Sequence, residues 1–424
     1  MLQIAFIREN VELVKERLKM VRNFDASEII DAAIDADKKR RQTQQKLDAL
    51  LNESKQLSSQ IGALYKQGKT DEANAIKVKT TDLKQETKQL EEDMNTAAAS
   101  LHDLLVKLPN FPHPSVPKGS TDEDNVVVKE VGALPVLDKA VLPHWELLEK
   151  YQMMSLELGT KIAGAGFPVF MGRGAKLQRA LVAYFLDCAA KAGYTEYIPP
   201  LMINEATAYG TGQLPDKEGQ MYYIEKDDLY MIPTAEVPIT NVWRDEIVKM
   251  NQLPIKMAGH SQCFRREAGS YGAHVRGLNR VHQFEKVEVI QIVHPDKSYE
   301  VLDEMVEHVG SILESLGLSY RILRLCGGDL GFTSALTYDF EVFSAAQGRW
   351  LEVSSVSNFE TFQSNRMKIR FKDENKKTRL CHTLNGSALA LPRIIAALLE
   401  NNQTPEGIVI PEVLRPYTGF DLIA

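Results

Sequence analysis

The sequence predicts an α+β protein in which a long antiparallel pair of helices precedes a domain built on a mainly antiparallel sheet flanked by helices. Residues before Pro109 contain no proline and repeat apolar residues at coiled-coil spacing. From about residue 140 onward, short runs rich in Val, Ile, Phe and Tyr alternate with helical stretches. Because proline breaks helix interiors while β-branched and aromatic residues favour strands, the two parts should fold differently.

Composition and charge are those of an ordinary globular protein. The chain has 424 residues, 44% hydrophobic and 25% charged, which favours two or more domains. Its formal net charge of −7 argues against a protein that coats nucleic acid indiscriminately, so any such contact has to be local. Two basic runs, residues 38–41 and residues 366–379, offer such a contact, although solvated charged faces are the simpler interpretation.

The cysteines and the N-terminus bear on metal binding and location. Cys188, Cys263, Cys326 and Cys381 are far apart and form no C-x-x-C pair, so we expect neither zinc nor a disulfide framework. The first residues include no basic segment leading into a long apolar run, and no stretch of 18 apolar residues occurs. We therefore expect a protein of the reducing cytoplasm without membrane contact.

The N-terminal part is predicted to form a helical hairpin. Apolar residues follow alternating steps of three and four from Leu47 to Leu64 and again from Ile76 to Leu104. Such a seam buries a narrow stripe against one partner helix. Because the turn at residues 67–70 is short, the helices should be antiparallel, and the second would be roughly 43 Å long at about 1.5 Å per residue. A dimerisation or spacer coiled coil is the alternative to a binding arm.

A cluster of prolines ends the helical part, at positions 109, 112, 114 and 117. Prolines this dense mark turns and irregular chain. We expect an N-terminal domain over residues 1–108, a linker over residues 109–135 and a second domain over residues 136–424.

The second domain has an unusual set of candidate nucleotide-binding residues. It lacks a G-x-x-x-x-G-K-[ST] loop and a G-x-G-x-x-G that opens a helix, so side chains on a sheet would have to hold a nucleotide. Residues 264–267 (Phe-Arg-Arg-Glu) and residues 280–288 (Arg-Val-His-Gln-Phe-Glu-Lys-Val-Glu) are predicted to be strands of a hairpin joined by the loop 268–279. The hairpin would offer an arginine for phosphate, a carboxylate for an adenine amino group and a ring for the base.

A third segment adds another cation. Residues 384–393 (Leu-Asn-Gly-Ser-Ala-Leu-Ala-Leu-Pro-Arg) read as a strand that runs into a helix over residues 394–400. The arginine near the helix start suits a phosphate, although a surface ion pair is its commoner use.

Together these segments resemble the class II aminoacyl-tRNA synthetases. Residues 193–200 are similar to the first motif of that class, which builds its dimer interface, residues 264–284 to the second motif and residues 386–393 to the third. The resemblance is closest to the seryl-tRNA synthetases and covers essentially the whole chain. It includes residues 7–10, 209–215, 234–236, 282–284 and 384–387. Departures from the family pattern are Arg266, where a small polar residue is usual, and Ala388 and Pro392, where glycines are common.

The resemblance implies ATP-dependent attachment of L-serine to tRNA(Ser), and also to selenocysteine tRNA, through a seryl-adenylate in a cytoplasmic homodimer. The helical arm of such enzymes reaches across the dimer to the long variable arm of the tRNA. Two alternatives are a paralogue that loads a small amino acid on a carrier protein and a non-catalytic coiled-coil interaction protein. The intact arm argues against the first, and the retained Arg265, Glu267 and Arg393 argue against the second.

The resemblance also implies roles for individual residues. Arg265 and Arg393 would be catalytic by binding the α- and γ-phosphates, while Glu352 and Ser355 would hold Mg²⁺ through ATP. The implied ATP-binding residues are Arg265, Arg266, Glu267, Val281, Phe284, Glu352, Val353, Ser354, Ser355 and Arg393. The implied serine-binding residues are Thr234, Ala235, Glu236, Arg265, Glu288, Asn385 and Ser387.

Overall fold

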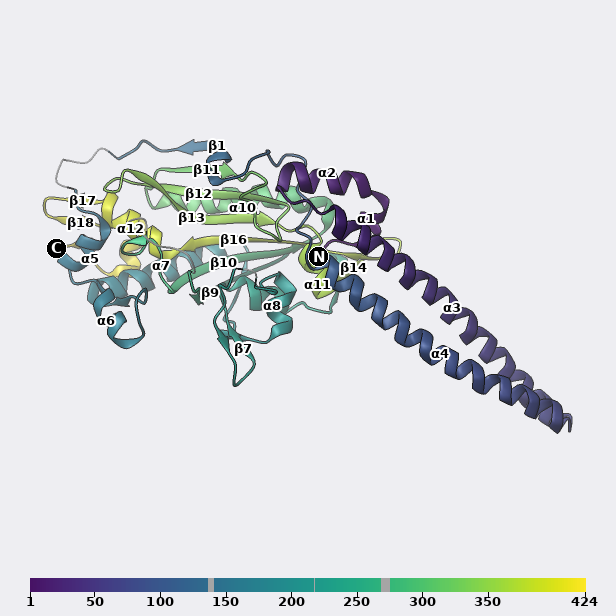
Figure 1. The fold of residues 1–424 in the computed structure, drawn as a ribbon. Coiled ribbons are helices and arrows are strands. Elements are labelled where there is room, and N and C mark those ends of the chain that lie inside the picture. Colours follow the sequence, from purple (N-terminus) through teal and green to yellow (C-terminus); the bar gives the residue numbers. More distant parts are fainter. Residues whose placement is uncertain (136–140, 217, 268–274) are drawn as a thin grey trace. The chain divides into compact units, whose positions relative to one another are not determined.

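The computed structural model describes residues 1–135, 141–216, 218–267 and 275–424 (Figure 1). The first seven residues of the predicted loop 268–279 lie outside the described residues. The described chain divides into two compact units, namely Met1–Met20 with Phe24–Pro109 and Val21–Asn23 with Asn110–Ala424.

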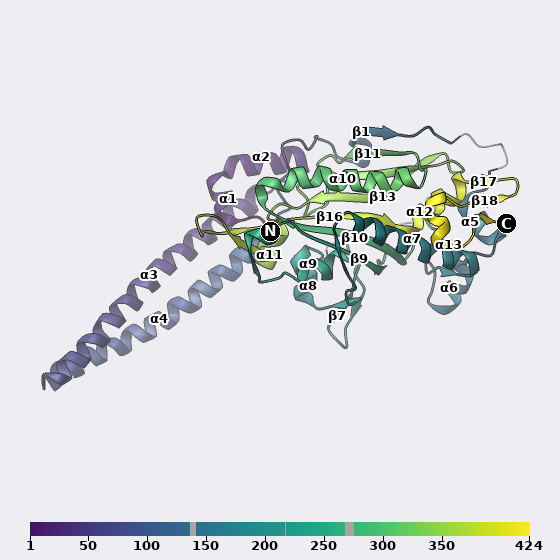
Figure 2. The ribbon, with the colours of Figure 1, turned by 180° about the vertical axis from the view of Figure 1, so that it is seen from behind.

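The first unit is helical, as the proline-free sequence predicted. Its helices are α1 (Ile4–Glu9), most of α2 (Val11–Arg22), α3 (Ser27–Lys66) and α4 (Thr70–Leu105). The helices α3 and α4 form the predicted antiparallel hairpin, visible as the long pair in Figures 1 and 2. Gly68 in the turn between them has φ +75°, a left-handed conformation that glycine adopts without a steric penalty.

The apolar seam of the hairpin matches its predicted spacing. Every predicted seam position between Leu47 and Leu104 is buried or half-buried. The hydroxyl groups of two polar seam residues, Thr80 and Thr87, each donate a hydrogen bond to the backbone carbonyl four residues earlier. These two hydroxyls are therefore satisfied within α4 and need no partner across the seam.

A buried carboxylate joins α1 to α3. Asp37 has a side chain only 1% exposed and accepts hydrogen bonds from Arg8, Arg40 and Arg41, each 2.9 Å long. Burial raises the pKa of Asp37, but the hydrogen bonds from Arg40 and Arg8 and the charges of Arg40 and Arg41 outweigh it, so the pKa lies below its usual value. Two of the four cations in the basic run 38–41 are thus engaged within the first unit.

The second basic run is divided in a similar way. Arg366 is buried and donates to the carbonyls of Tyr209 and Leu214. Arg379 is more exposed and lies 3.6 Å from Asp296. The run 366–379 therefore combines a structural arginine with surface cations and is not one uniform basic face.

The second unit is built on one large sheet. The strand order is β1 (Val126–Val131), β11 (Tyr320–Arg324), β12 (Leu336–Ser344), β13 (Arg349–Asn358), β16 (His382–Ala390), β10 (Gln283–Val293), β9 (Ile255–Phe264) and β4 (Thr195–Tyr197). All neighbouring pairs are antiparallel except β4 with β9. This confirms the predicted mainly antiparallel sheet.

Four helices pack against the sheet or against one another and complete its core. They are α5 (His144–Lys150), α7 (Gly172–Lys191), α10 (Ser298–Ser315) and α12 (Leu391–Asn401). Figure 2 shows α10 lying across β13 and β16, and contacts also join α12 to β12, β13 and β10. Fully buried side chains such as Phe185, Phe340 and Leu313 fill the space between these layers.

The segment predicted as a linker contributes to this sheet. Strand β1 falls within residues 109–135 and pairs with β11 as the edge strand. Three successive valines, residues 126–128, favour extended chain, a signal that the preceding proline cluster obscured. The connection is therefore part of the second unit rather than a free tether.

Smaller elements surround the large sheet. The remaining helices are α6 (Leu156–Ile162), α8 (Glu205–Thr211), α9 (Glu236–Asn241), α11 (Phe362–Met367) and α13 (Arg415–Thr418). The small sheets are β2 (Met154–Ser155) with β3 (Val169–Phe170); β5 (Met202–Ile203), β7 (Leu229–Met231) and β6 (Tyr223–Ile224); β15 (Thr378–Leu380), β14 (Arg370–Lys372) and β8 (Ile247–Val248); and β17 (Gln403–Thr404), β18 (Gly407–Val409) and β19 (Leu422–Ile423). Among the residues described, no helix has the length and apolarity needed to cross a bilayer.

Replacing Asp37 by alanine should loosen the first unit. Three arginines lose a shared acceptor, which we expect to cost about 1–3 kcal/mol, and hydrogen exchange of α1 and α3 at pH 7 should accelerate accordingly. Because the folded pKa of Asp37 is depressed, its contribution is present above the unfolded pKa and is lost as the pH falls through the folded pKa.

The matched control is Asp31→Ala, which removes an exposed partner of Lys15. Exposed pairs contribute little to stability, so exchange should change only slightly. Equal acceleration by the two substitutions would contradict the structural role assigned to Asp37.

Candidate active site

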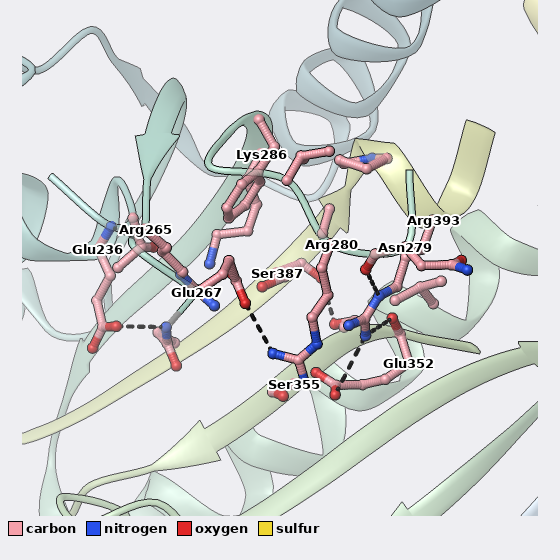
Figure 3. Close-up of a pocket in the computed structure, with 18 of the residues that line it drawn as sticks. Glu236, Arg265, Glu267, Asn279, Arg280, Lys286, Glu352, Ser355, Ser387 and Arg393 are labelled. Carbon is pink, nitrogen blue, oxygen red and sulfur yellow. Dashed lines mark hydrogen bonds and ion pairs between the residues drawn. The ribbon is translucent and has the colours of Figure 1, made fainter. Parts of the chain in front are cut away.

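One pocket on the large sheet gathers most of the predicted site residues. It has a volume of about 430 Å³. The predicted residues that line it are Thr234, Glu236, Arg265, Glu267, Val281, Phe284, Glu352, Val353, Ser354, Ser355, Asn385, Ser387 and Arg393. Arginines from distant parts of the chain, Arg265 and Arg393, thus face one cavity (Figure 3).

The register of β16 explains this convergence. In the antiparallel ladders, Ser387 lies opposite Glu288 of β10, and Asn385 lies opposite Ser357 of β13. Because side chains alternate between the faces of a sheet, residues 385 and 387 point to the same side. Directly after the strand, α12 begins and presents Arg393 from its first turn.

Two buried carboxylates lie at one end of the pocket, Glu236 in its lining and Glu288 directly behind it. Glu236 accepts from Gln363 Nε2 at 2.7 Å and from Asn385 Nδ2 at 2.9 Å. Burial, together with the negative charge of Glu288, raises the pKa of Glu236 to about 7. This carboxyl therefore changes protonation state near neutral pH.

The second carboxylate is held by hydroxyls and a lysine. Glu288 is fully buried and accepts from Thr234 Oγ1 at 2.8 Å and from Ser387 Oγ at 3.3 Å. It also pairs with Lys286, whose side chain lines the pocket. Its Oε2 atom has no hydrogen-bond partner among the residues described. This end is suited to a small ligand that carries a cation and a hydroxyl.

The other end presents cations and hard oxygens. Arg393 donates from Nε to the carbonyl of Asn279 at 3.1 Å and from Nη1 to the carbonyl of Glu352 at 2.8 Å. The guanidinium of Arg265 lies 5.3 Å from the ring centre of Phe284. Fixed cations beside an aromatic ring can bind phosphates and a nucleobase.

Three predicted residues do not line this pocket. The guanidinium of Arg266 lies 4.8 Å from the ring centre of Tyr222, and its Nε donates to the carbonyl of Met221. Ala235 is fully buried, directly before α9. Glu288 lies behind the hydroxyls that it binds. The backbone N–H of Arg266 donates to the carbonyl of Gln220, so both its backbone and its side chain are held by residues 220–222 outside the pocket.

The predicted hairpin is present, but its first strand ends earlier than expected. Strand β9 ends at Phe264, which lies opposite Gln283 of β10. Arg265 and Glu267 therefore follow the strand, and Glu267 has a left-handed φ of +48°. Arg280 Nη1 lies 2.8 Å from Glu267 Oε2 and orients that carboxylate.

Some lining residues were not predicted as site residues. They are Gln213, Leu278, Asn279, Arg280, Lys286, Ser357, Phe359, Ala390 and Pro392. Lys286 had a usable signal, since it lies two residues after Phe284 and two before Glu288 in β10 and shares their face. Asn279 and Gln213 lie in irregular segments, where no periodicity indicates which way a side chain points.

Comparison with known proteins identifies relatives over the whole length. Residues 1–112 match the model of the seryl-tRNA synthetase N-terminal domain, and residues 222–402 match that of the tRNA synthetase class II core domain (G, H, P, S and T). A serine–tRNA ligase of Salinibacter ruber is 51% identical over 422 residues, covering 99% of this chain and 98% of the relative.

Solved structures agree with the sequence relatives. The seryl-tRNA synthetase of Pyrococcus horikoshii complexed with ATP has a TM-score of 0.92 at 33% identity and covers 100% of this chain and 99% of that chain. The cytoplasmic serine–tRNA ligase of Naegleria fowleri in complex with AMP has a TM-score of 0.87 at 28% identity, with coverage of 100% and 98%.

Replacing Glu236 by glutamine should change how stability depends on pH. With a folded pKa of about 7 against a usual 4.5, the carboxyl is protonated in the folded protein and ionised in the unfolded chain between these values. Stability of the ligand-free protein should therefore fall by about 3 kcal/mol as the pH rises through this window. Thermal denaturation at pH 5 and pH 8 should show a smaller decline for Glu236→Gln.

The exposed Glu225→Gln variant serves as the control and should keep the pH dependence of the unmodified chain. If Glu236→Gln shows the same decline as the unmodified chain, the raised pKa is wrong.

Proposed function

Because the chain belongs to the seryl-tRNA synthetase family and is a ligase that attaches serine to tRNA with ATP, we propose that the pocket on the large sheet carries out both steps of that reaction. The observation that carries this proposal is the arrangement of one cavity. Its carboxylate end can hold a small ammonium compound, while Arg265, Arg393 and Phe284 at the other end can hold a nucleotide.

Serine would bind at the carboxylate end. Its ammonium group would lie against Glu236 and Glu288, and its hydroxyl would bond to polar neighbours such as Thr234, Asn385 and Ser387. An apolar analogue would leave these buried groups unpaired, so the pocket would discriminate strongly against it.

ATP would lie along the remainder of the cavity. Phe284 would stack on one face of adenine and Arg393 on the other, while Glu267, oriented by Arg280, would accept from the adenine amino group. Arg393 would also reach the γ-phosphate, and Arg265 would bind the α-phosphate.

In the first step a carboxylate oxygen of serine forms a bond to the α-phosphorus as the bond to pyrophosphate breaks, giving seryl-adenylate. Negative charge builds on phosphate oxygens, so fixed guanidinium groups contribute by positioning and electrostatic stabilisation. In the second step a terminal ribose hydroxyl of tRNA attacks the serine carbonyl carbon and AMP leaves with the bonding electrons.

Residues of β12 and β13 fit a magnesium ion that binds together with ATP. Glu352 and Ser355 line the pocket and offer hard oxygen atoms. Asp339 lies opposite Ser355 in the ladder, and burial together with the charge of Glu352 raises its pKa well above the usual value. Carboxylates crowded in this way gain from a divalent cation, which would offset charge on the phosphates.

Partner binding would extend beyond the pocket. The exposed apolar residues Ile198, Leu201 and Met202, next to edge strand β4, support a homodimer that forms through the first class II motif. The polar α3–α4 hairpin suits recognition of tRNA(Ser), and of selenocysteine tRNA, by shape and backbone contacts. The enzyme would act in the cytoplasm, where aminoacyl-tRNA serves translation.

The test of this function is ATP–pyrophosphate exchange with each of the twenty amino acids. Serine should give the strongest exchange by a wide margin. Strong exchange with another amino acid, or none with serine, would contradict the assignment of the carboxylate end.

Arg265→Ala should reduce serine-dependent exchange by roughly 10²–10³-fold, because a fixed charge on the reacting phosphate is lost. The neighbouring Arg266→Ala is the matched control. Its guanidinium packs on Tyr222, so exchange should fall by less than about tenfold. Equal losses in steady-state exchange would show that the geometry separating these arginines is not the one used in catalysis.

Deleting residues 30–100, which removes most of α3 and α4, should leave serine-dependent exchange within about threefold while it lowers tRNA charging by more than about 100-fold. The pocket lies entirely within the second unit, whereas the hairpin would hold the tRNA. Exchange and charging would be measured on the same preparation. A parallel fall in the two activities would contradict this division of roles.

A further inference from the structure

A buried histidine and glutamate lie behind the phosphate end of the pocket. His144, at the start of α5, and Glu400, in the last turns of α12, are both 0% exposed. The Nδ1 atom of His144 lies 2.7 Å from Glu400 Oε1, and the backbone N–H of His144 donates to the same oxygen at 2.9 Å. Neither residue belongs to the motifs that identify the family or lines the cavity.

The hydrogen bonds of His144 determine which tautomer its imidazole adopts. The backbone N–H of Leu278 donates to His144 Nε2 at 2.9 Å, so Nε2 is an acceptor. The proton therefore sits on Nδ1 and points to Glu400. Burial raises the pKa of Glu400, but the hydrogen bonds from His144 and Ser344 lower it by a larger amount. The net shift of the pKa is therefore downward, and the acceptor is a carboxylate.

A second series of hydrogen bonds connects Glu400 to the same loop. Gln347 Nε2 donates to Glu400 Oε1 at 3.0 Å, and Gln347 Oε1 accepts from Asn279 Nδ2 at 3.0 Å. The carbonyl of Asn279 in turn accepts from Arg393 Nε at 3.1 Å. Two consecutive loop residues, Leu278 and Asn279, are thus tied to Glu400, and both line the cavity.

We infer that His144 is a positioning residue for ATP, acting through the Leu278–Asn279 backbone on the direction of Arg393. The inference rests on the proposed role of Arg393 at the phosphates. Without the Nε2 acceptor, the buried N–H of Leu278 has no partner and the loop has to shift to find one. The Asn279 carbonyl then moves away from Arg393, while the carboxylate end of the pocket, where serine would bind, keeps all of its contacts.

The loop residue before Leu278 supports the same geometry. Gly277 has φ +68°, and a Cβ atom there would lie 2.3 Å from His144 Nε2. A side chain at this position therefore displaces the imidazole or the loop. This gives an independent way to disturb the contact without altering His144.

Two substitutions of His144 separate its two bonds. Glutamine places an acceptor near the Nε2 position and can keep the bond from Leu278, whereas asparagine places a donor near the Nδ1 position and can keep the bond to Glu400. In serine-dependent exchange, His144→Asn should raise KM for ATP about tenfold, with KM for serine and kcat within about twofold. His144→Gln should raise KM for ATP by no more than about threefold.

Gly277→Ala provides a test from the loop side, with Gly317→Ala as its control. Gly317 has φ +69° but no atom near its would-be Cβ, so the backbone strain is matched and the contact is absent. Gly277→Ala should raise KM for ATP at least fivefold, and Gly317→Ala should not change it.

The outcomes distinguish this inference from the proposed function. Serine-dependent exchange by the unmodified chain tests the function alone. Equal KM values for ATP in His144→Asn and His144→Gln, or a rise in KM for serine that matches the rise for ATP, would overturn the positioning role. If His144→Asn does not fold, an unchanged KM for ATP in Gly277→Ala overturns it instead.

Discussion

The antiparallel pairing of β16 with β10 on one side and β13 on the other is the constraint on which the site depends. These ladders bring the ammonium of Lys286, the amide of Asn385 and the hydroxyl of Ser357 to one pocket, although their segments are far apart in sequence. A register shift of one residue would turn every side chain of β16 to the opposite face. The buried apolar residues on the other face of these strands therefore fix the position of the polar ones.

Charge in the pocket is arranged so that the buried carboxylates stay compatible with folding. Lys286 pairs with Glu288, and amide donors satisfy Glu236, whose pKa is nevertheless raised by burial. Isolated buried charges are costly, so each one needs a partner in the free protein or in its ligand. An ammonium ligand would supply the remaining compensation, and this links the electrostatics of the free protein to its choice of substrate.

Sequence patterns predicted the parts of the fold that have a period or a motif. The heptad seam predicted both helices of the hairpin, and motif residues such as Phe284 and Arg393 do meet in one cavity. Strand β1 was missed because its valines follow a proline cluster, and the outward turn of Arg266 depends on where β9 ends. His144 gave no signal at all, since its partners Leu278 and Glu400 are joined only by tertiary packing.

The central place of β16 also sets the order in which a growing polypeptide can assemble. Its neighbour β10 leaves the ribosome first, and every residue from His294 to Cys381 has to be made before β16 follows. At roughly 5–20 residues per second this takes several seconds. The inner edge of β10 is unpaired throughout this time, and that of β13 is unpaired from its own synthesis onward. Exposed edges of this kind invite association between nascent chains. The late arrival of one strand thus leaves the edges of its two neighbours open to such contacts until synthesis is nearly complete.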